Sequence, residues 1–425
     1  MNITIHRGTD QIGGCVTEYE HDGWKLFVDY GEQLPGYPKS KPLEVEGLNK
    51  GDLTKSALLI THYHGDHIGC IKDLPKELAI YIGELGREIQ KVLSTHLSYE
   101  DKNQNLIIER LNAAKVFSPG HPFSIGPFKI MPVTTDHSAF DAYAFKIEAD
   151  GVSVFHTGDF RTHGFRSGKL DKMLDLYIGK VDHVVCEGTN VARPDSTSRS
   201  ERELQSDFRK ALRQKIGHIV YLSSTNIDRL FSLYHAALEA RMLFLVDAYQ
   251  KHIMDKVAES HSLWSKSKLY QYDVNYPPQV PFGNGDDFTF NDKFVKTIKD
   301  RGYVLIARAN KKFDKLIEEL PGEKKKYLSM WKGYVDEKSG AYNKELAKAL
   351  GSEYEYLHTS GHCDMKSLRE IFRHLQPKAI IPIHTDKPDK FAELFCDDWN
   401  IMRLHDGQSI QLPILNNKDE NHTYL

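Results

Sequence analysis

The densest set of chemically active side chains in this sequence is the run Thr61-His62-Tyr63-His64-Gly65-Asp66-His67. Three imidazoles and a carboxylate within six residues would leave buried polar groups unpaired unless a cation neutralised them. Gly65 allows the sharp turn that brings such side chains together. Imidazole nitrogen together with carboxylate oxygen is a donor set that suits Zn²⁺. The run therefore predicts a metal site.

Three later segments offer complementary ligands, and each follows an apolar run typical of a strand. These segments are Thr134-Thr135-Asp136-His137-Ser138, His156-Thr157-Gly158-Asp159-Phe160-Arg161 and Ile381-Pro382-Ile383-His384-Thr385. We expect these strands to end together in one sheet, so that the His and Asp side chains meet. Jointly the segments supply ligands for two metals: three His plus a bridging carboxylate for one, and Asp, His and His plus the same carboxylate for the other.

The elements that must position these ligands are short strands alternating with helices. Apolar runs bounded by turn residues predict strands at 24–29, 57–61, 128–133, 152–156 and 181–186. Between them, the segment 83–97 has apolar residues at the spacing of an amphipathic helix. Strands interleaved with helices favour an α/β layered domain.

The pattern changes between residues 188 and 355 and then returns to its first form. Helices are predicted at 200–216 and 228–241, with apolar strand-like runs at 218–223 and 242–246. After 355, strands at 355–359 and 379–383 flank a helix at 366–375. The middle segment is therefore predicted to be nested within the first domain. The middle segment has an excess of basic residues, whereas the rest of the chain has an excess of acidic ones. This difference in charge is expected if an anionic substrate binds to the basic segment, and equally if both segments have ordinary solvated surfaces.

Composition excludes several classes of protein. The chain has 425 residues, a net charge of −3, 40% hydrophobic and 27% charged residues, which are values of a soluble globular protein with a large core. No apolar run approaches the roughly 20 residues that cross a bilayer, and no secretory leader is visible. The five cysteines are scattered without a CxxC pair, so we expect reduced thiols and a cytoplasmic protein.

The motifs resemble those of the metallo-β-lactamase superfamily, and more closely its nucleic-acid-processing branch, the β-CASP nucleases. The string Gly158-Asp159-Phe160-Arg161 is typical of that branch. The positions that match the four metal motifs are Asp29, then His62, His64, Asp66 and His67, then His137, and last Asp159. The resemblance implies an α/β fold: an αββα sandwich formed by residues 1–187 and 356–425, with an inserted α/β β-CASP cap at 188–355.

Three further positions match motifs that are specific to the β-CASP branch: Glu187 (motif A), His362 (motif B) and His384 (motif C). The resemblance implies one metal on His62, His64 and His137, a second on Asp66, His67 and His384, and Asp159 bridging the two. The metals are expected to be Zn²⁺, with Mn²⁺ left open.

The implied activity is two-metal phosphodiester hydrolysis, in which the cations lower the pKa of a water to roughly 7 and so provide a hydroxide nucleophile. Asp66 is expected to be essential, and Asp29 to orient a metal ligand. His362, positioned by Glu187, is the candidate general acid; its alternative interpretation is a structural residue beside the metals.

Single-stranded RNA is the substrate that the resemblance implies, with DNA left open. The loop at 223–229 resembles a phosphate-contacting loop, which makes Ser224, Asn226 and Arg229 candidate substrate ligands. Ser-Thr-Asn before a helix is also an ordinary N-cap. Two rival functions remain: a small-molecule hydrolase acting on an ester, thioester or cyclic nucleotide with the same metals, and a non-catalytic scaffolding subunit. No membrane partner is expected, and a homodimer is left open.

Overall fold

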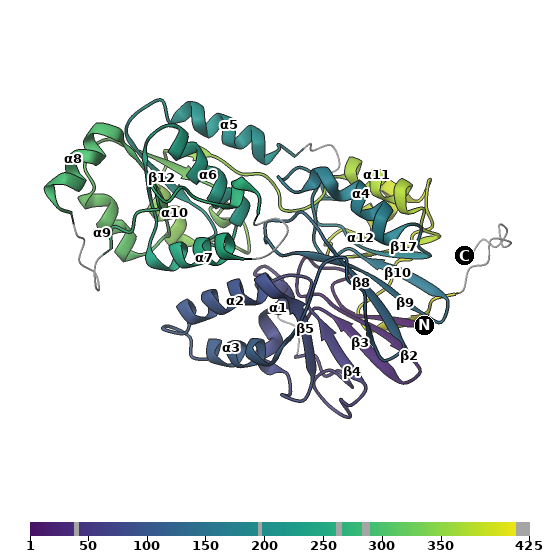
Figure 1. Cartoon of the computed structure of the whole chain (residues 1–425). Coiled ribbons are helices and arrows are strands. Elements are labelled where there is room, and N and C mark those ends of the chain that lie inside the picture. The colour runs from purple at the N-terminus through teal and green to yellow at the C-terminus, as the bar shows by residue number, and fades with distance from the viewer. Residues whose placement is uncertain (38–41, 194–197, 261–265, 283–289, 414–425) are drawn as a thin grey trace.

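The computed structural model describes residues 1–37, 42–193, 198–260, 266–282 and 290–413, and contains three sheets (Figure 1). Two of the sheets pack face to face. The third forms a separate lobe from the middle of the chain. No helix in the described part of the chain is both long and apolar enough to cross a membrane. All five cysteines are free, as expected for reduced thiols.

The first sheet has seven strands in the order β18-β1-β2-β3-β4-β5-β6. Its strands are β1 (Asn2–Arg7), β2 (Val16–His21), β3 (Trp24–Val28), β4 (Ser56–Leu59), β5 (Ala79–Gly83), β6 (Lys115–Phe117) and β18 (Gln408–Gln411). The helices that follow β4 and β5 are α1 (Gly65–Ile68), α2 (Glu84–Leu97) and α3 (Gln104–Ala113). Apolar residues of α1 and α3, such as Ile68 and Leu111, pack on the outer face of this sheet.

The second sheet has six strands in the order β17-β11-β10-β9-β8-β7. These are β7 (Phe123–Ile125), β8 (Phe128–Thr134), β9 (Tyr143–Ala149), β10 (Val152–His156), β11 (His183–Glu187) and β17 (Ala379–Ile383). Helices α4 (Leu170–Met173), α11 (Met365–Leu375) and α12 (Pro388–Phe395) cover its outer face. The inner faces of the two sheets share one apolar core, to which Ile5, Leu59 and Ile147 belong. The expected αββα sandwich is therefore confirmed.

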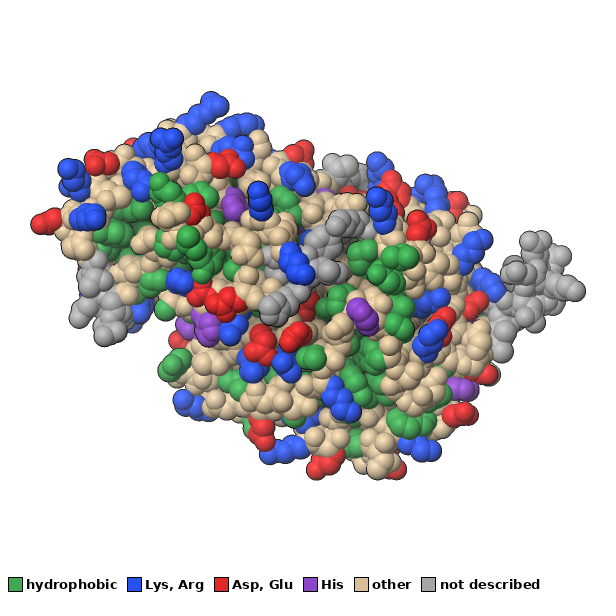
Figure 2. All heavy atoms as spheres, in the orientation of Figure 1, with side chains coloured by type: hydrophobic (Ala, Val, Ile, Leu, Met, Phe, Trp, Pro, Cys, Tyr) green, Lys and Arg blue, Asp and Glu red, His purple; other side chains and the backbone are tan. Residues whose placement is uncertain are grey.

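The third sheet has five strands in the order β13-β14-β12-β15-β16, and all neighbouring strands are parallel. Its strands are β12 (Gly217–Tyr221), β13 (Leu243–Leu245), β14 (Tyr303–Ala307), β15 (Lys324–Leu328) and β16 (Glu355–Tyr356). Helices α5 (Glu201–Ala211), α6 (Ile227–Glu239) and α7 (Ala248–Glu259) pack on one face. Helices α8 (Asp292–Arg301), α9 (Lys311–Glu319) and α10 (Lys344–Leu350) pack on the other. In the view of Figure 2, Lys and Arg side chains gather along the outer edge of this lobe.

The third sheet is nested in the chain of the sandwich. Strand β11 precedes it and β17 follows it, yet β11 and β17 are parallel neighbours in the second sheet, with Val185 opposite Ile381. Strand β18 then pairs with β1 in the first sheet. The lobe also shares an apolar cluster with the sandwich, in which Ile89 of α2 joins residues such as Met254 of α7. The domain boundaries at 187/188 and 355/356 stay a prediction.

A buried network of charges joins the lobe to the sandwich. Arg161 donates from Nε to Asp136 at 2.9 Å, from Nη1 to Glu201 at 2.9 Å and from Nη2 to Asp228 at 2.8 Å. All four side chains are at most 1% exposed. Asp136 belongs to the sandwich, whereas Glu201 and Asp228 begin helices of the lobe. The free energy of burying these charges is offset only while the network is complete.

We therefore expect Arg161→Met to destabilise the protein strongly. The substitution keeps much of the side-chain volume but removes the cation that contacts Asp136, Glu201 and Asp228 together. The free energy of unfolding should fall by about 3–5 kcal/mol, measured by urea denaturation. Arg209→Met is the control, because the Arg209–Glu239 pair is about half exposed and contributes at most about 1 kcal/mol. Equal effects of the two substitutions would contradict this account.

Candidate metal centre

The expected metal ligands lie at the carboxyl ends of strands from both sheets. His62 and His64 lie between β4 and α1, and Asp66 and His67 lie on α1. The other candidates follow the ends of strands in the second sheet: His137 after β8, Asp159 after β10 and His384 after β17. Strands β8, β10 and β17 run in the same direction, so their carboxyl ends meet at one edge.

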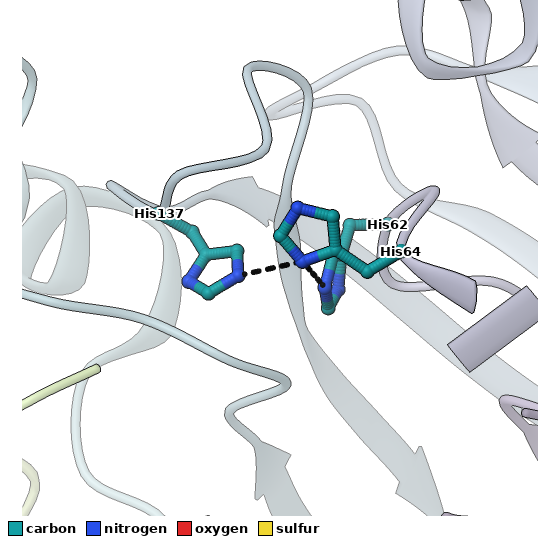
Figure 3. Close-up of side chains that lie close together, drawn as sticks. All are labelled: His62, His64 and His137. Atoms are coloured by element: carbon teal, nitrogen blue, oxygen red, sulfur yellow. Dashed lines mark hydrogen bonds between the residues drawn. The ribbon is translucent and has the colours of Figure 1, made fainter. Parts of the chain in front are cut away.

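Three imidazoles converge on one point (Figure 3). Nδ1 of His64 lies 3.1 Å from Nε2 of His62 and 3.1 Å from Nε2 of His137. Two nitrogens bound to one tetrahedral Zn²⁺ at about 2.1 Å lie roughly 3.4 Å apart. The spacing of the three nitrogens is therefore close to that of ligands on a shared cation. Nε2 of His62 and of His137 are each 3.9 Å from Oδ2 of Asp159.

A second group lies on the other side of Asp159. Nε2 of His67 is 3.2 Å from Asp159 Oδ2 and 3.7 Å from Asp66 Oδ2. Nε2 of His384 is 3.3 Å from Asp66 Oδ2 and 3.6 Å from Asp159 Oδ2. The ligand atoms of these four residues lie within 4.8 Å of one another. Asp159 thus faces both groups, which is the position expected of a bridging carboxylate.

The remaining ring nitrogens of four histidines are held by outer hydrogen bonds. Nδ1 of His67 donates to Asp29 Oδ2 at 2.7 Å, and Nδ1 of His137 donates to the Gly361 carbonyl at 2.6 Å. The hydroxyl of Thr61 donates to Asp29 and accepts from Nδ1 of His62 at 3.0 Å, while that of Thr189 accepts from Nδ1 of His384 at 2.8 Å. These bonds place the proton on Nδ1 and leave a lone pair on each Nε2.

This donor set fits divalent cations. The lone pairs on Nε2 of His67 and His384 face carboxylate oxygens, and Nε2 of His67 is buried without a hydrogen-bond partner. A lone pair facing a carboxylate is repulsive unless a cation lies between them. Borderline-soft ions such as Zn²⁺ accept both imidazole and carboxylate. The residues present therefore suit metal ions at this position.

The electrostatics of the site agree with this fit. Burial, followed by the charge of neighbouring imidazoles, lowers the pKa of His62, so this ring stays neutral and able to bind a metal. Burial likewise lowers the pKa of His64 to about 4. Burial also opposes the charged form of His67, but the carboxylates of Asp159, Asp66 and Asp29 outweigh it and raise its pKa. The His67 position favours positive charge, whether a proton or a metal ion supplies it.

One candidate metal ligand and one residue that positions a ligand have an unusual backbone. Asp29 follows β3 with φ of +63°, and His384 follows β17 with φ of +52°. The left-handed region is sparsely populated by residues other than glycine, and such strain concentrates at functional sites. Gly31 allows another close approach, because a Cβ there would lie 1.7 Å from the carbonyl oxygen of Asp66.

His362 and Glu187 lie beside the second group. Nδ1 of His362 is 3.0 Å from Oε2 of Glu187, and it is 3.7 Å from Asp159 Oδ2. Burial alone would lower the pKa of His362, but the carboxylates of Glu187 and Asp159 outweigh it and raise this pKa to about 9. The side chain of Asn190 holds the loop of His362 by donating to the carbonyls of His362 and Cys363.

Thr189 and Asn190 were not predicted from the sequence. Both follow β11, whose last residue is Glu187, and polar residues after strands of the same sheet were the signal that predicted His137, Asp159 and His384 as ligands. Applied to Glu187-Gly188-Thr189-Asn190, that signal would have found them.

The three predicted substrate ligands lie in the lobe, in the loop before α6 and in its first turn. This loop contacts the segment of the predicted metal ligands, because the hydroxyl of Tyr63 donates to the Thr225 carbonyl at 3.0 Å. Asn226 caps α6 by accepting from the backbone N–H of Arg229, the alternative that the sequence left open. Arg229 is 1% exposed and donates to Glu201, Ser329 and the Leu357 carbonyl, so its guanidinium is occupied within the protein. We do not retain Arg229 as a phosphate ligand. Ser224 is 8% exposed, and its substrate role stays a prediction.

Family models match two parts of the chain. Residues 40–218, which include most of the candidate ligands, match a β-lactamase superfamily domain. Residues 352–401, which include His362 and His384, match a Zn-dependent metallo-hydrolase RNA specificity domain.

Several curated proteins are similar over long stretches. Ribonuclease J of Sinorhizobium meliloti is 25% identical over 92% of this chain and 70% of its own length. Ribonuclease J of Helicobacter pylori (strain B128) is 21% identical over 97% of this chain and 60% of its own length. Ribonuclease J of Mycolicibacterium smegmatis is 28% identical over 56% of this chain and 43% of its own length. A crystal structure of a protein of unknown function from Enterococcus faecalis shares the fold, with a TM-score of 0.69 and 17% identity over 97% of this chain and 99% of that chain.

The bond between Thr189 and His384 provides a test of the metal centre. We expect Thr189→Val to weaken binding of Zn²⁺ or Mn²⁺ on the order of 10- to 100-fold, because His384 loses the partner that orients its ring. Competition with a chelator measures the affinity. Thr297→Val is the matched control, since Thr297 donates only to the Lys293 carbonyl of α8. An affinity that stays unchanged in Thr189→Val would refute this role.

Proposed function

Because the chain belongs to the β-CASP, ribonuclease J-like branch of the metallo-β-lactamase superfamily, we propose that it is a metal-dependent ribonuclease that hydrolyses single-stranded RNA. One observation carries this proposal above the others. A complete His/Asp constellation lies beside the His362–Glu187 pair, and His362 belongs to the segment that matches an RNA specificity domain. A non-catalytic scaffold has no need of such a complete set of ligands.

Two divalent cations are proposed, with Zn²⁺ as the leading candidate and Mn²⁺ as the alternative. His62, His64 and His137 would hold one, Asp66, His67 and His384 the other, and Asp159 both. When bound, such cations lower the pKa of a water to about 7 and stabilise negative charge on a phosphate. The role of Asp29 is to fix the ring of His67, and Thr61 extends this support to His62.

His362 is proposed as the general acid. Glu187 holds its Nδ1, which leaves Nε2 as the nitrogen that can donate a proton to the leaving oxygen of the scissile phosphodiester. His362 is more exposed than the metal ligands His67 and His384, at 20% of its side chain against 2% and 1%. A donor that must reach the substrate needs such access.

The lobe from 188 to 355 is proposed as the cap that holds RNA over the metal centre. Its excess of basic residues over acidic ones suits a polyanion. DNA and small phosphodiesters or esters are the competing substrates, and the cleavage assay below separates them. A cytoplasmic location and a homodimeric state stay predictions from the sequence.

The first test is cleavage of end-labelled single-stranded RNA and DNA of one sequence, with Zn²⁺ or Mn²⁺. We expect RNA to be cleaved only when metal is present, and Asp66→Ala to abolish cleavage because a ligand of one cation is lost. Folded, metal-loaded protein that leaves RNA intact but cleaves DNA or a small ester would contradict the proposal.

A second test concerns His362. We expect His362→Ala to lower turnover by on the order of 10²- to 10⁴-fold, the usual contribution of a positioned acid, while metal content stays at the wild-type value. Elemental analysis of the purified variant measures the metal. If the variant also loses metal, His362 is a ligand or a structural residue instead of the acid. His374→Ala is the control, because His374 lies in the last turn of α11 and pairs with exposed Asp175.

A further inference from the structure

Two large aromatic side chains are exposed at one edge of the lobe. Trp331 is 46% exposed and follows β15, while Tyr356 is 38% exposed and ends β16. Strands β15 and β16 are parallel neighbours, so both residues lie at the carboxyl edge of the sheet. Open parallel sheets commonly bind ligands at this edge.

The indole of Trp331 is held in place from one side. A Cβ on Gly333 would lie 2.2 Å from the indole ring, so the ring packs directly on the backbone of a residue that has no side chain. The ring of Tyr334 meets the indole edge-on, with ring centroids 5.8 Å apart and an interplanar angle of 81°. These two contacts hold the indole of Trp331 in one position, while 46% of the residue stays exposed to solvent.

Positive charge accompanies the aromatic rings. Nζ of Lys332 lies 4.4 Å from the centroid of the Tyr356 ring, where the ring attracts a cation. The guanidinium of Arg193 is close enough to influence Tyr356 electrostatically, although burial is the main cause of that tyrosine's raised pKa. A cation beside an exposed aromatic ring suits a nucleotide, which offers both a phosphate and a π-face.

This surface borders the sandwich on two sides. Next to Trp331, the carbonyl of Tyr334 accepts from the backbone N–H of Asn343 at 2.8 Å, and a Cβ on Gly340 of the same segment would lie 2.3 Å from Cα of Gly36 in the sandwich. Next to Tyr356, Arg193 donates to Asn190 Oδ1 at 2.7 Å, and Asn190 donates to the His362 carbonyl at 3.1 Å. A strand that leaves the metal centre along this edge therefore meets the exposed rings.

We propose that Trp331, Lys332 and Tyr356 form a binding subsite for one nucleotide of single-stranded RNA, next to the nucleotide that is cleaved. A base stacks on the indole of Trp331, and Lys332, oriented by Tyr356, pairs with the adjoining phosphate. The subsite rests on the proposed ribonuclease function. It extends that function by explaining how the protein binds a single strand without forming hydrogen bonds to the edges of the bases. Stacking tolerates any base, so the subsite favours single strands without selecting a sequence.

The test measures binding of the metal-loaded protein to a fluorescent, 2′-O-methylated single-stranded RNA that resists cleavage. We expect Trp331→Ala to raise Kd on the order of 5- to 100-fold, and Trp331→Phe to recover most of the affinity. Tyr99→Ala is the control for loss of an exposed aromatic ring, because Tyr99 is 81% exposed between α2 and α3. Metal content and thermal midpoint verify that each variant is folded.

Two further variants examine the parts of the subsite separately. Gly333→Ala should raise Kd with Trp331 still present, because the added Cβ displaces the indole. Lys332→Ala should reduce the slope of log Kd against log salt concentration by the amount that corresponds to about one phosphate contact. RNA should also quench tryptophan fluorescence in the wild type and not in Trp331→Phe.

The outcomes separate this proposal from the one it rests on. Unchanged Kd values in Trp331→Ala and Gly333→Ala, with normal RNA binding by the wild type, overturn the subsite alone. Failure of the wild type to bind RNA overturns the ribonuclease as well. Quenching that persists in Trp331→Phe also counts against stacking at this position.

Discussion

The structure depends on one electrostatic constraint: imidazole lone pairs and carboxylates are buried facing one another, and only a cation makes that arrangement favourable. Each Nδ1 proton of His62, His67, His137 and His384 is directed outwards by a hydrogen bond, which fixes the lone pair inwards. The strained backbone of Asp29 and His384 belongs to the same arrangement. Much of the sandwich is a frame that holds these groups at the ends of its strands, against their mutual repulsion.

A second set of buried charges connects the lobe to the loops of the metal centre. Arg166 donates to the carbonyl of His137 at 2.5 Å, and Arg229 donates to the carbonyl of Leu357, on the segment that leads to His362. The same arginines are paired with Asp228 and Glu201 at the starts of α6 and α5. The loops that carry His137 and His362 are therefore anchored to the lobe, so its position and the geometry of the centre are linked.

The predicted metal ligands lie beside strand ends, where the local pattern marks both the strand and the polar residues that follow it, and the structure brings their side chains together. Strands β10 and β17 have the predicted bounds, and α11 differs by one residue. The strand predicted at 355–359 stops at Tyr356, because the chain leaves the edge of the third sheet there to return to the sandwich.

Predictions that depend on distant partners were weaker. Arg229 resembled a phosphate ligand, but Glu201 and Ser329 occupy its guanidinium, and no local pattern reveals pairing across 28 and 100 residues. The burial of Arg161 with three carboxylates is likewise a property of the folded chain alone. Charge type can be found in the sequence, whereas the partner of a charge is set by tertiary structure.

The pairing of β11 with β17 has a consequence for synthesis on the ribosome. These neighbouring strands are separated by the entire lobe, and β1 pairs with β18, the last strand of the described chain. At about 5–20 residues per second, roughly 10–40 s pass between the emergence of Glu187 and that of His384. During that interval the nascent sheet has an open edge beside β11, which the growing lobe must leave accessible. The metal centre is thus completed only after the whole lobe has been synthesised.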